Sequence, residues 1–394
     1  MRLNKRTARI SPSITLGISA KAKEMAAQGI DVVSFAAGEP DFDTPDFIKN
    51  AWKKALDGGK TKYVPVGGIP GLKNGIIEKL KNDNALAYKP AEIMVSVGAK
   101  GALYNIIMTI VDDGDEVLIP TPYWVSYNDM VIAAGGVPVF VPSSLEKEFK
   151  ITAEDLKKYI TPKTKALFLN SPSNPTGAVY TKDELGKLGD FLKTQDILII
   201  SDEIYEKILY DKAEHVSIAA LVPELKEKTI VINGFSKSHS MTGWRLGYAA
   251  GPAEIIKVAT ELQGQSTSGA TSFVQFAAVE GLKDMSFLEA MRSEFEKRRD
   301  FIVAGLNKID GFVCPNPLGA FYVFPDVSAL YGRTLGGVKI KGSMDLAEVL
   351  LEKAHVATVP GIGFGMDENL RFSFATSLEE IQKGLDRIKK FIEG

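Results

Sequence analysis

Seven short apolar runs between residues 93 and 250 constrain the fold of this chain more than any other feature. Several of them, such as ILII and ALFL, are apolar throughout, which is typical of strands covered on both faces. Helical segments lie between the runs, for example over residues 182–193 and 253–262. This alternation predicts an α/β fold, with a mostly parallel seven-stranded sheet in a three-layer domain. The runs span residues 93–97, 116–119, 137–141, 166–169, 197–201, 229–232 and 246–250.

The pattern changes after about residue 290, where a long charged helix is expected over residues 287–308. The apolar segments AFYVF, ATV and LRFSF and helices over 344–355 and 378–392 follow, which predicts a smaller α+β domain. The segment before residue 44 has no strand partner in the large sheet. We therefore expect a large domain over residues 45–290 and a discontinuous small domain made of residues 1–44 and 291–394.

Charge and composition exclude several classes of function. A net charge of −2 gives no basic field that would recruit nucleic acid or anionic lipid. No run of about 18 apolar residues occurs, so we expect no membrane span. The single cysteine, Cys314, suits a reducing compartment, and we expect a cytoplasmic protein. The three histidines have no ligand-like spacing, so we expect no metal site.

The stretch GFSKSHSMTGWRLGY, residues 234–248, carries the strongest chemical signal. The apolar run 229–232 delivers Lys237 to the end of a buried strand, where lost solvation lowers the pKa of an amine. A neutral amine can form a Schiff base with an aldehyde. Ser236 and Arg245 supply a hydroxyl and a fork of charged donors, which suit a phosphate. An aldehyde with a phosphate describes pyridoxal 5′-phosphate (PLP), although a lone lysine in a loop is usually a solvated surface charge.

The full arrangement of Ser236, Lys237 and Arg245, followed by the run LGY, resembles the lysine motif of the class I and II aminotransferases. The segments SDEIY and NPTG resemble the same family in sequence and in order. The resemblance extends from about residue 9 to the C-terminus and is closest to aspartate aminotransferases of subgroup Iγ. It implies the fold type I of PLP-dependent transferases.

Asp202 follows the run ILIIS directly, in SDEIY. A carboxylate at this edge of the sheet could pair with the protonated ring nitrogen of PLP and keep the ring cationic. Tyr205 could donate a hydrogen bond to the phenolate oxygen of the ring. The alternative for Asp202 is that it caps a helix or turn. We assign Lys237, Asp202 and Tyr205 as the catalytic residues.

Other polar residues past the apolar runs complete the expected cofactor site. Asn174, in the rigid loop SPSNPTG, can offer an amide donor to the ring oxygen. Gly98, Ala99 and Lys100 open a helix whose free amides suit a phosphate, with plain helix capping as the alternative. The resemblance assigns the phosphate to the backbone amides of Ala99 and Lys100.

Three further residues owe their assignment mainly to the resemblance. Trp124, in TPYWVSY, is placed against the face of the ring, although core packing is the alternative for an isolated tryptophan. Arg371, in NLRFSFATS, is assigned to the substrate α-carboxylate with the backbone of Gly38, and a surface salt bridge is the alternative. Tyr63 has the position of a tyrosine that reaches the phosphate of a neighbouring subunit, which implies a homodimer with shared active sites.

Subgroup Iγ binds the distal carboxylate of a dicarboxylic substrate through a lysine and two hydroxyls, and these positions hold Lys100, Ser13 and Thr15. The resemblance also places Trp124 and Asn174 against the substrate. It implies ping-pong transfer of the amino group from L-aspartate to 2-oxoglutarate, with oxaloacetate and L-glutamate as products. Members that accept prephenate tend to carry a basic residue where this chain has Ser11, so we expect weak prephenate activity.

Several rival functions stay open. The chain could be an aminotransferase of aromatic, alanine or prephenate specificity, or a PLP β-lyase, which releases ammonia and pyruvate. It could also be the ligand-sensing domain of a transcription regulator, because such regulators use this fold. The regulator would need an added DNA-binding module, and we find no basic helical module in the sequence.

Overall fold

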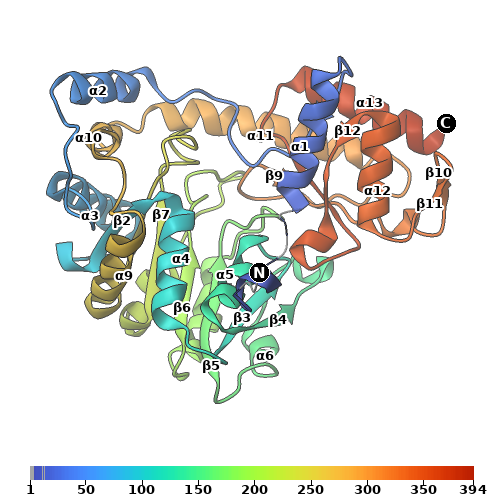
Figure 1. Cartoon of the computed structure of the whole chain (residues 1–394). Coiled ribbons are helices and arrows are strands. Elements are labelled where there is room, and N and C mark those ends of the chain that lie inside the picture. Colours follow the sequence, from blue (N-terminus) through green and yellow to red (C-terminus); the bar gives the residue numbers. More distant parts are fainter. Residues whose placement is uncertain (1–3, 11, 13) are drawn as a thin grey trace.

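The computed structural model describes residues 4–10, 12 and 14–394. Its centre is a seven-stranded sheet in the order β2-β8-β7-β6-β5-β3-β4. Only β8 runs against its two neighbours, and the other neighbouring strands are parallel. The predicted α/β fold with a mostly parallel sheet is confirmed (Figure 1). The strands are β2 (Ile93–Val97), β3 (Glu116–Thr121), β4 (Val137–Pro142), β5 (Thr164–Asn170), β6 (Leu198–Asp202), β7 (Thr229–Gly234) and β8 (Leu246–Ala250).

Successive residues of the central strands are buried on opposite faces of the sheet. In β3, Val117 and Ile119 belong to one apolar cluster and Leu118 to another. Helices α4 (Gly98–Ile110) and α9 (Ala253–Ser266) contribute to the first cluster, and α7 (Lys182–Leu192) contributes to the second. Because helices cover both faces, these strands are apolar throughout rather than alternating.

The two ends of the chain fold together. β1 (Val33–Ser34) pairs in parallel with β12 (Val356–Ala357). A second small sheet has the order β13-β14-β9, with antiparallel pairs. Figure 1 shows α1, α12 and α13 at the same end of the molecule, with α11 running from there towards α10. These contacts support a small domain built from both chain ends, and its boundaries stay a prediction.

One of the remaining helices differs locally from its prediction. The helix predicted over 344–355 is α12, which ends at Val349 and continues as a π-helical turn, Leu350–Ala354. The further strands are β9 (Tyr322–Val323), β10 (Thr334–Leu335), β11 (Val338–Lys339), β13 (Val359–Pro360) and β14 (Leu370–Ser373). The further helices are α1 (Ile14–Ala27), α2 (Asp46–Asp57), α3 (Pro70–Asn84), α5 (Ser126–Ala134), α6 (Ala153–Leu156), α8 (Ile218–Leu221), α10 (Ser272–Gly281), α11 (Phe287–Leu306), α12 (Ser343–Val349) and α13 (Leu378–Glu393).

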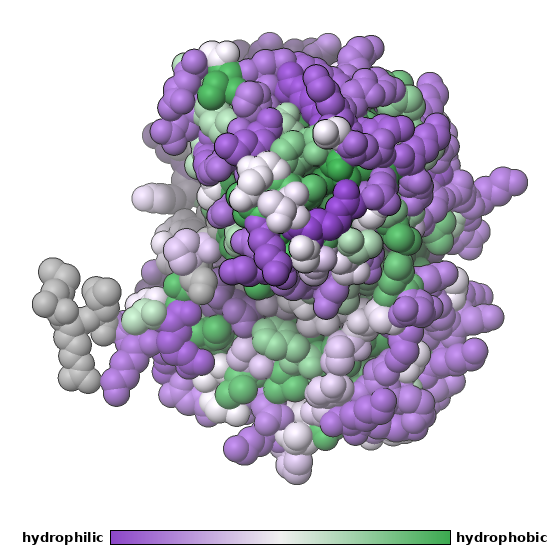
Figure 2. All heavy atoms as spheres, turned by 90° about the vertical axis from the view of Figure 1, so that its right-hand side faces the viewer, coloured by the Kyte–Doolittle hydropathy of each residue, from purple (hydrophilic) through white to green (hydrophobic). Residues whose placement is uncertain are grey.

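The face on the right-hand side of Figure 1 is largely hydrophilic, and its hydrophobic side chains form small scattered patches (Figure 2). Within residues 4–10, 12 and 14–394, no helix combines the length and the apolar character needed to cross a bilayer.

The carboxyl ends of the parallel strands bring polar residues together at one edge of the large sheet. Asn170, at the end of β5, pairs in register with Asp202, at the end of β6. The neighbouring strand β7 ends at Gly234, and the loop to β8 begins there. In open parallel sheets this edge is where ligands bind.

Candidate active site

A cavity of about 910 Å³ lies at this edge and reaches the small sheet that contains β14. Twelve of the residues expected from the sequence line it, and they come from both ends of the chain and from the large sheet. They are Thr15, Gly38, Ala99, Lys100, Trp124, Asn174, Asp202, Tyr205, Ser236, Lys237, Arg245 and Arg371.

Lys237 lies three residues after the end of β7 and is half-buried. Its amine donates a hydrogen bond to the carbonyl oxygen of Gly38, and Nζ lies 5.9 Å from the centre of the Tyr205 ring. Burial lowers the pKa of Lys237 to about 8, although the nearby carboxylate of Glu39 opposes the shift. The nucleophilic, neutral form of the amine is therefore accessible close to neutral pH.

Asp202 is a buried carboxylate at the end of β6. The Tyr127 hydroxyl donates a hydrogen bond of 2.7 Å to Oδ2, and the backbone amide of Ile204 lies 3.3 Å from Oδ1. Burial raises the pKa of Asp202 to about 6 in spite of these donors. A buried carboxylate with a raised pKa is a site that a cationic ligand would stabilise.

Arg245 faces the start of α4. Gly98 has a φ of +71°, and a Cβ there would lie 2.6 Å from Nη2 of Arg245. A Cβ at Gly247 would lie 2.3 Å from the backbone nitrogen of Ala99, so β8 and α4 can approach this closely only with glycine. Ser236 lines the same part of the cavity. A helix N-terminus, a guanidinium and a hydroxyl form the donor set of an anion site.

Arg371, on β14, is only 2% exposed. Its Nη1 donates to Oδ1 of Asn174 over 3.1 Å, and its Nη2 donates to the carbonyl oxygen of Ala36 over 3.0 Å. Its Nε has no partner, and among the described residues no carboxylate pairs with the guanidinium. Burial lowers the pKa of Arg371. A buried cation without a counter-charge suits a ligand that carries a carboxylate.

Known proteins resemble this chain in sequence over nearly its whole length. The family described as aminotransferase class I and II matches residues 30–388 of the chain. The chain belongs to this family. A protein of Geobacillus stearothermophilus named "Aspartate aminotransferase" is 52% identical over 394 residues, which cover 100% of this chain and 99% of that protein. The Aquifex aeolicus protein named "Probable aspartate/prephenate aminotransferase" is also 52% identical, with 99% of this chain and 98% of that protein covered.

The fold of this chain also matches that of solved aminotransferase structures. The aspartate aminotransferase from Rhizobium meliloti superimposes with a TM-score of 0.97 at 43% identity, over 100% of this chain and 99% of that chain. The expected membership of the aminotransferase family and its fold are therefore confirmed.

The cavity of this aminotransferase also contains the cation of Lys100. Nζ of Lys100 lies 4.8 Å from the centre of the Trp124 ring. Burial lowers the pKa of Lys100, and Arg245 adds to the shift. The Oγ1 atom of Thr15 is buried and has no hydrogen-bond partner. Both groups therefore have bonding capacity left for a ligand.

Two of the predicted residues that the structure describes do not line the cavity. Gly98 lies just behind it and makes room for Arg245. Tyr63 is 98% exposed, so within one subunit it contacts no part of the site. Ser13, predicted to bind the distal carboxylate, lies outside the described residues, as does Ser11.

Sequence reasoning missed two tyrosines of this aminotransferase site. Tyr127 supports Asp202, and Tyr322 shares a 2.9 Å hydrogen bond with Tyr205 and lies under Arg371, 4.5 Å from ring centre to Cζ. Tyr127 follows Trp124 by three residues on the same segment, a spacing that could have placed both on one side. Tyr322 sits in AFYVF, which gave no signal beyond that of a core strand.

Proposed function

We propose that this aminotransferase binds PLP at the cavity and uses Lys237 as its covalent anchor. The observation that carries the proposal is the convergence of a half-buried amine with a lowered pKa, a buried carboxylate and an anion cradle in one cavity. Lys237 suits the aldehyde, Asp202 suits a protonated ring nitrogen, and Ser236, Arg245 and the amides of Ala99 and Lys100 suit the phosphate. Trp124 and Asn174 line the space between these groups.

When bound, PLP supplies an electron sink for the pair left by breakage of the Cα–H bond of an amino acid. The Asp202 carboxylate would pair with the protonated ring nitrogen and stabilise its positive charge. Tyr205 would donate a hydrogen bond to the ring oxygen, and Tyr322 holds the Tyr205 hydroxyl by their shared hydrogen bond. The Nζ atom of Lys237 accepts the proton from the substrate Cα and returns a proton later, as general base and then general acid.

Arg371 binds the α-carboxylate of the substrate with its free Nε and the neighbouring Asn174 amide. Lys100, Thr15 and Ser13 hold the distal carboxylate of a dicarboxylic substrate. A charged hydrogen bond from Lys100 contributes about 1.5–3 kcal/mol, which favours a dicarboxylate by tenfold or more. We infer that L-aspartate and 2-oxoglutarate are the substrates of a ping-pong exchange. Of these two substrates, aspartate appears in the names of the relatives.

We propose that the working enzyme is a homodimer in the cytoplasm. Tyr63 is 98% exposed, and tyrosine is enriched at protein interfaces. Its hydroxyl would then contact the phosphate bound by the partner subunit. Each active site would be complete only in the dimer.

The test is a half-reaction panel across the twenty amino acids, which follows the visible band of the bound cofactor after each addition. Aspartate and glutamate should convert the band fastest, and Lys100→Gln should remove at least about tenfold of the preference for aspartate over alanine. Equal rates with alanine or phenylalanine would contradict the assignment of Lys100, Thr15 and Ser13. Prephenate should be a poor acceptor, although the Aquifex aeolicus relative carries it in its name.

Product analysis separates the rival reactions. Ammonia and pyruvate would indicate a β-lyase, whereas a keto acid formed without ammonia indicates amino transfer. Binding to DNA in a gel-shift assay would support a regulator in place of an enzyme.

A further inference from the structure

The turn after β6 has some side chains that line the cavity and others that lie in a separate buried polar cluster. Asp202 and Tyr205 line the cavity described above. Glu203 and Glu206, which alternate with them in the sequence SDEIYE, point into a buried polar cluster that the proposed chemistry does not use. Glu203 is 1% exposed and Glu206 is 5% exposed. Two carboxylates this deeply buried need strong compensation.

Glu206 joins the turn to the end of α3. Lys79 donates a short charged hydrogen bond to its Oε1, and Nδ2 of Asn84 donates to its Oε2 over 2.7 Å. Burial opposes ionisation, but Lys79 and His215 outweigh it and lower the pKa of Glu206 to about 2. At the rim, Nζ of Lys207 lies 2.7 Å from Oδ2 of Asp83, which adds a second tie between the same two elements.

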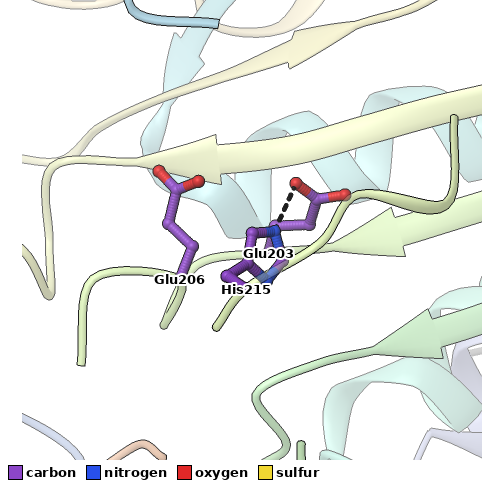
Figure 3. A group of neighbouring side chains, drawn as sticks. All are labelled: Glu203, Glu206 and His215. Atoms are coloured by element: carbon purple, nitrogen blue, oxygen red, sulfur yellow. Dashed lines mark hydrogen bonds and ion pairs between the residues drawn. The ribbon is translucent and has the colours of Figure 1, made fainter. Parts of the chain in front are cut away.

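Glu203 anchors the other side of the turn. Its Oε1 accepts hydrogen bonds from Ser201 (2.9 Å) and Ser217 (2.7 Å), and its Oε2 lies 3.0 Å from Nε2 of His215. Its backbone amide donates to the carbonyl oxygen of Ile232 on β7 over 2.9 Å. Figure 3 shows the two carboxylates on either side of the His215 ring, with the hydrogen bond on the Glu203 side.

A divalent cation is the obvious alternative occupant, because one possible ligand atom from each of Glu203, Glu206 and His215 lies within 4.8 Å of the others. The contacts argue against it. All four carboxylate oxygens already accept hydrogen bonds from protein donors, and Lys79 supplies the positive charge. A metal ion would have to displace these donors and would meet the Lys79 ammonium beside it.

We propose that Glu206, clamped by Lys79 and Asn84, is a positioning residue that sets the place of Asp202 and Tyr205 in the active site. The inference rests on the proposed function, because only a bound PLP gives these two side chains their role. The backbone amide of Glu206 donates a hydrogen bond of 3.0 Å to the carbonyl oxygen of Glu203, which closes a four-residue turn. A displacement of Glu206 would therefore also displace Asp202 and Tyr205. The α3 helix is the fixed body against which it is held.

The test compares Glu206→Gln with wild type by two readouts. One is the pH midpoint at which the visible band of the bound cofactor changes, which reports the placement of Tyr205 and Asp202. The other is the division of any kinetic effect between kcat and KM for aspartate. We expect the midpoint to shift by at least about 0.5 pH unit and kcat to fall about tenfold, because misplacement by a fraction of an ångström weakens groups that act on the reacting atoms. KM should change less than about twofold, because Arg371 is untouched.

Glu184→Gln is the matched control. Glu184 also accepts a hydrogen bond from a buried lysine, since its Oε1 lies 2.7 Å from Nζ of Lys150, but it belongs to α7 and not to the turn. This variant should lower the thermal unfolding midpoint without moving the cofactor band or kcat. If Glu206→Gln behaves in the same way, its role is structural only and the proposal is overturned.

Two further measurements keep the outcome decisive. If Glu206→Gln does not fold, Asn84→Ala, which removes one neutral donor, should move the same two readouts in the same direction by a smaller amount, and no movement overturns the proposal. Treatment of the wild type with EDTA should leave the unfolding midpoint unchanged, and an EDTA-sensitive midpoint that Glu206→Gln abolishes would indicate a metal site instead. A wild-type protein that binds no PLP would overturn the proposed function. If the wild type binds PLP but the pH midpoint of the cofactor band is the same in Glu206→Gln, only this inference is overturned.

Discussion

The hydroxyl of Tyr127 donates a 2.7 Å hydrogen bond to Oδ2 of Asp202, and both side chains are buried. The Tyr127 ring stacks on Phe168 of β5, with 4.2 Å between ring centres, so the donor is held by core packing. The same bond lowers the pKa of Asp202 against the larger, raising effect of burial. The carboxylate is thereby kept ionisable where a ring cation would need it.

Tyr127→Phe removes this donor and leaves the ring stacking in place. The pKa of Asp202 should rise further, so less of the carboxylate is ionised. We expect kcat to fall about tenfold, the equivalent of roughly 1–1.5 kcal/mol for one hydrogen bond. Steady-state kinetics with aspartate and 2-oxoglutarate measure the kcat of this variant. An unchanged kcat at every pH would contradict the supporting role of Tyr127.

Asp202→Asn removes the charge altogether and should cost more, on the order of 10²–10³ in kcat, as expected for loss of a preorganised charge at the reacting group. Asp155→Asn is a suitable control, because Asp155 is also buried and hydrogen-bonded, to Lys147 and Thr152, but lies outside the cavity. The control should lose stability and keep its kcat. Equal kinetic effects in the two variants would refute the pairing of Asp202 with the cofactor.

Arg371→Lys keeps the positive charge and loses the planar fork. The single ammonium group of lysine cannot donate to both oxygens of the substrate carboxylate as a guanidinium can. KM for aspartate should therefore rise by about tenfold or more. Arg299→Lys provides the comparison: Arg299 is also almost fully buried but pairs with Asp211 away from the cavity, so its KM should stay that of the wild type. A KM that rises equally in both variants would show a general loss of structure.

The pH dependence of cofactor capture follows from Lys237. Burial lowers its pKa from 10.5 to about 8, so the amine loses its proton as the pH rises through about 8. Below that pH the neutral fraction, and with it the initial rate of covalent capture of PLP by the cofactor-free protein, should fall tenfold per pH unit. Above pH 8 the rate should level off. Stopped-flow absorbance measures this rate, and a rise that continues to pH 10 would indicate a fully solvated amine.

The sheet could be predicted from the sequence because its central strands are buried on both faces. Runs such as ILII contain no polar residue, so they are easily recognised as strands. The observed strands differ from the predicted ones only by a few residues at their ends. Lys237, Asp202 and Asn174 could be placed near one another because each lies at or just past the end of a strand, and these strands end at the same edge.

Other features depend on contacts between distant segments and gave no local signal. Tyr322 meets Tyr205 across 117 positions of the chain, and Lys79 meets Glu206 across 127. Glu203 and Glu206 look like ordinary surface charges in SDEIYE, and only the packing of α3 and His215 around them shows that they are buried. The role proposed for Tyr63 depends on a second subunit, which a single chain does not contain.

The most direct test of the role of Lys237 is to reduce the PLP-loaded protein with borohydride and map the labelled peptide by mass spectrometry. We predict that the cofactor is attached to Lys237, within the segment GFSKSHSMTGWR, and that Lys237→Ala carries no label and at least about 10⁴-fold less activity. A label on another lysine of the wild type, or an equal label in Lys237→Ala, would contradict it.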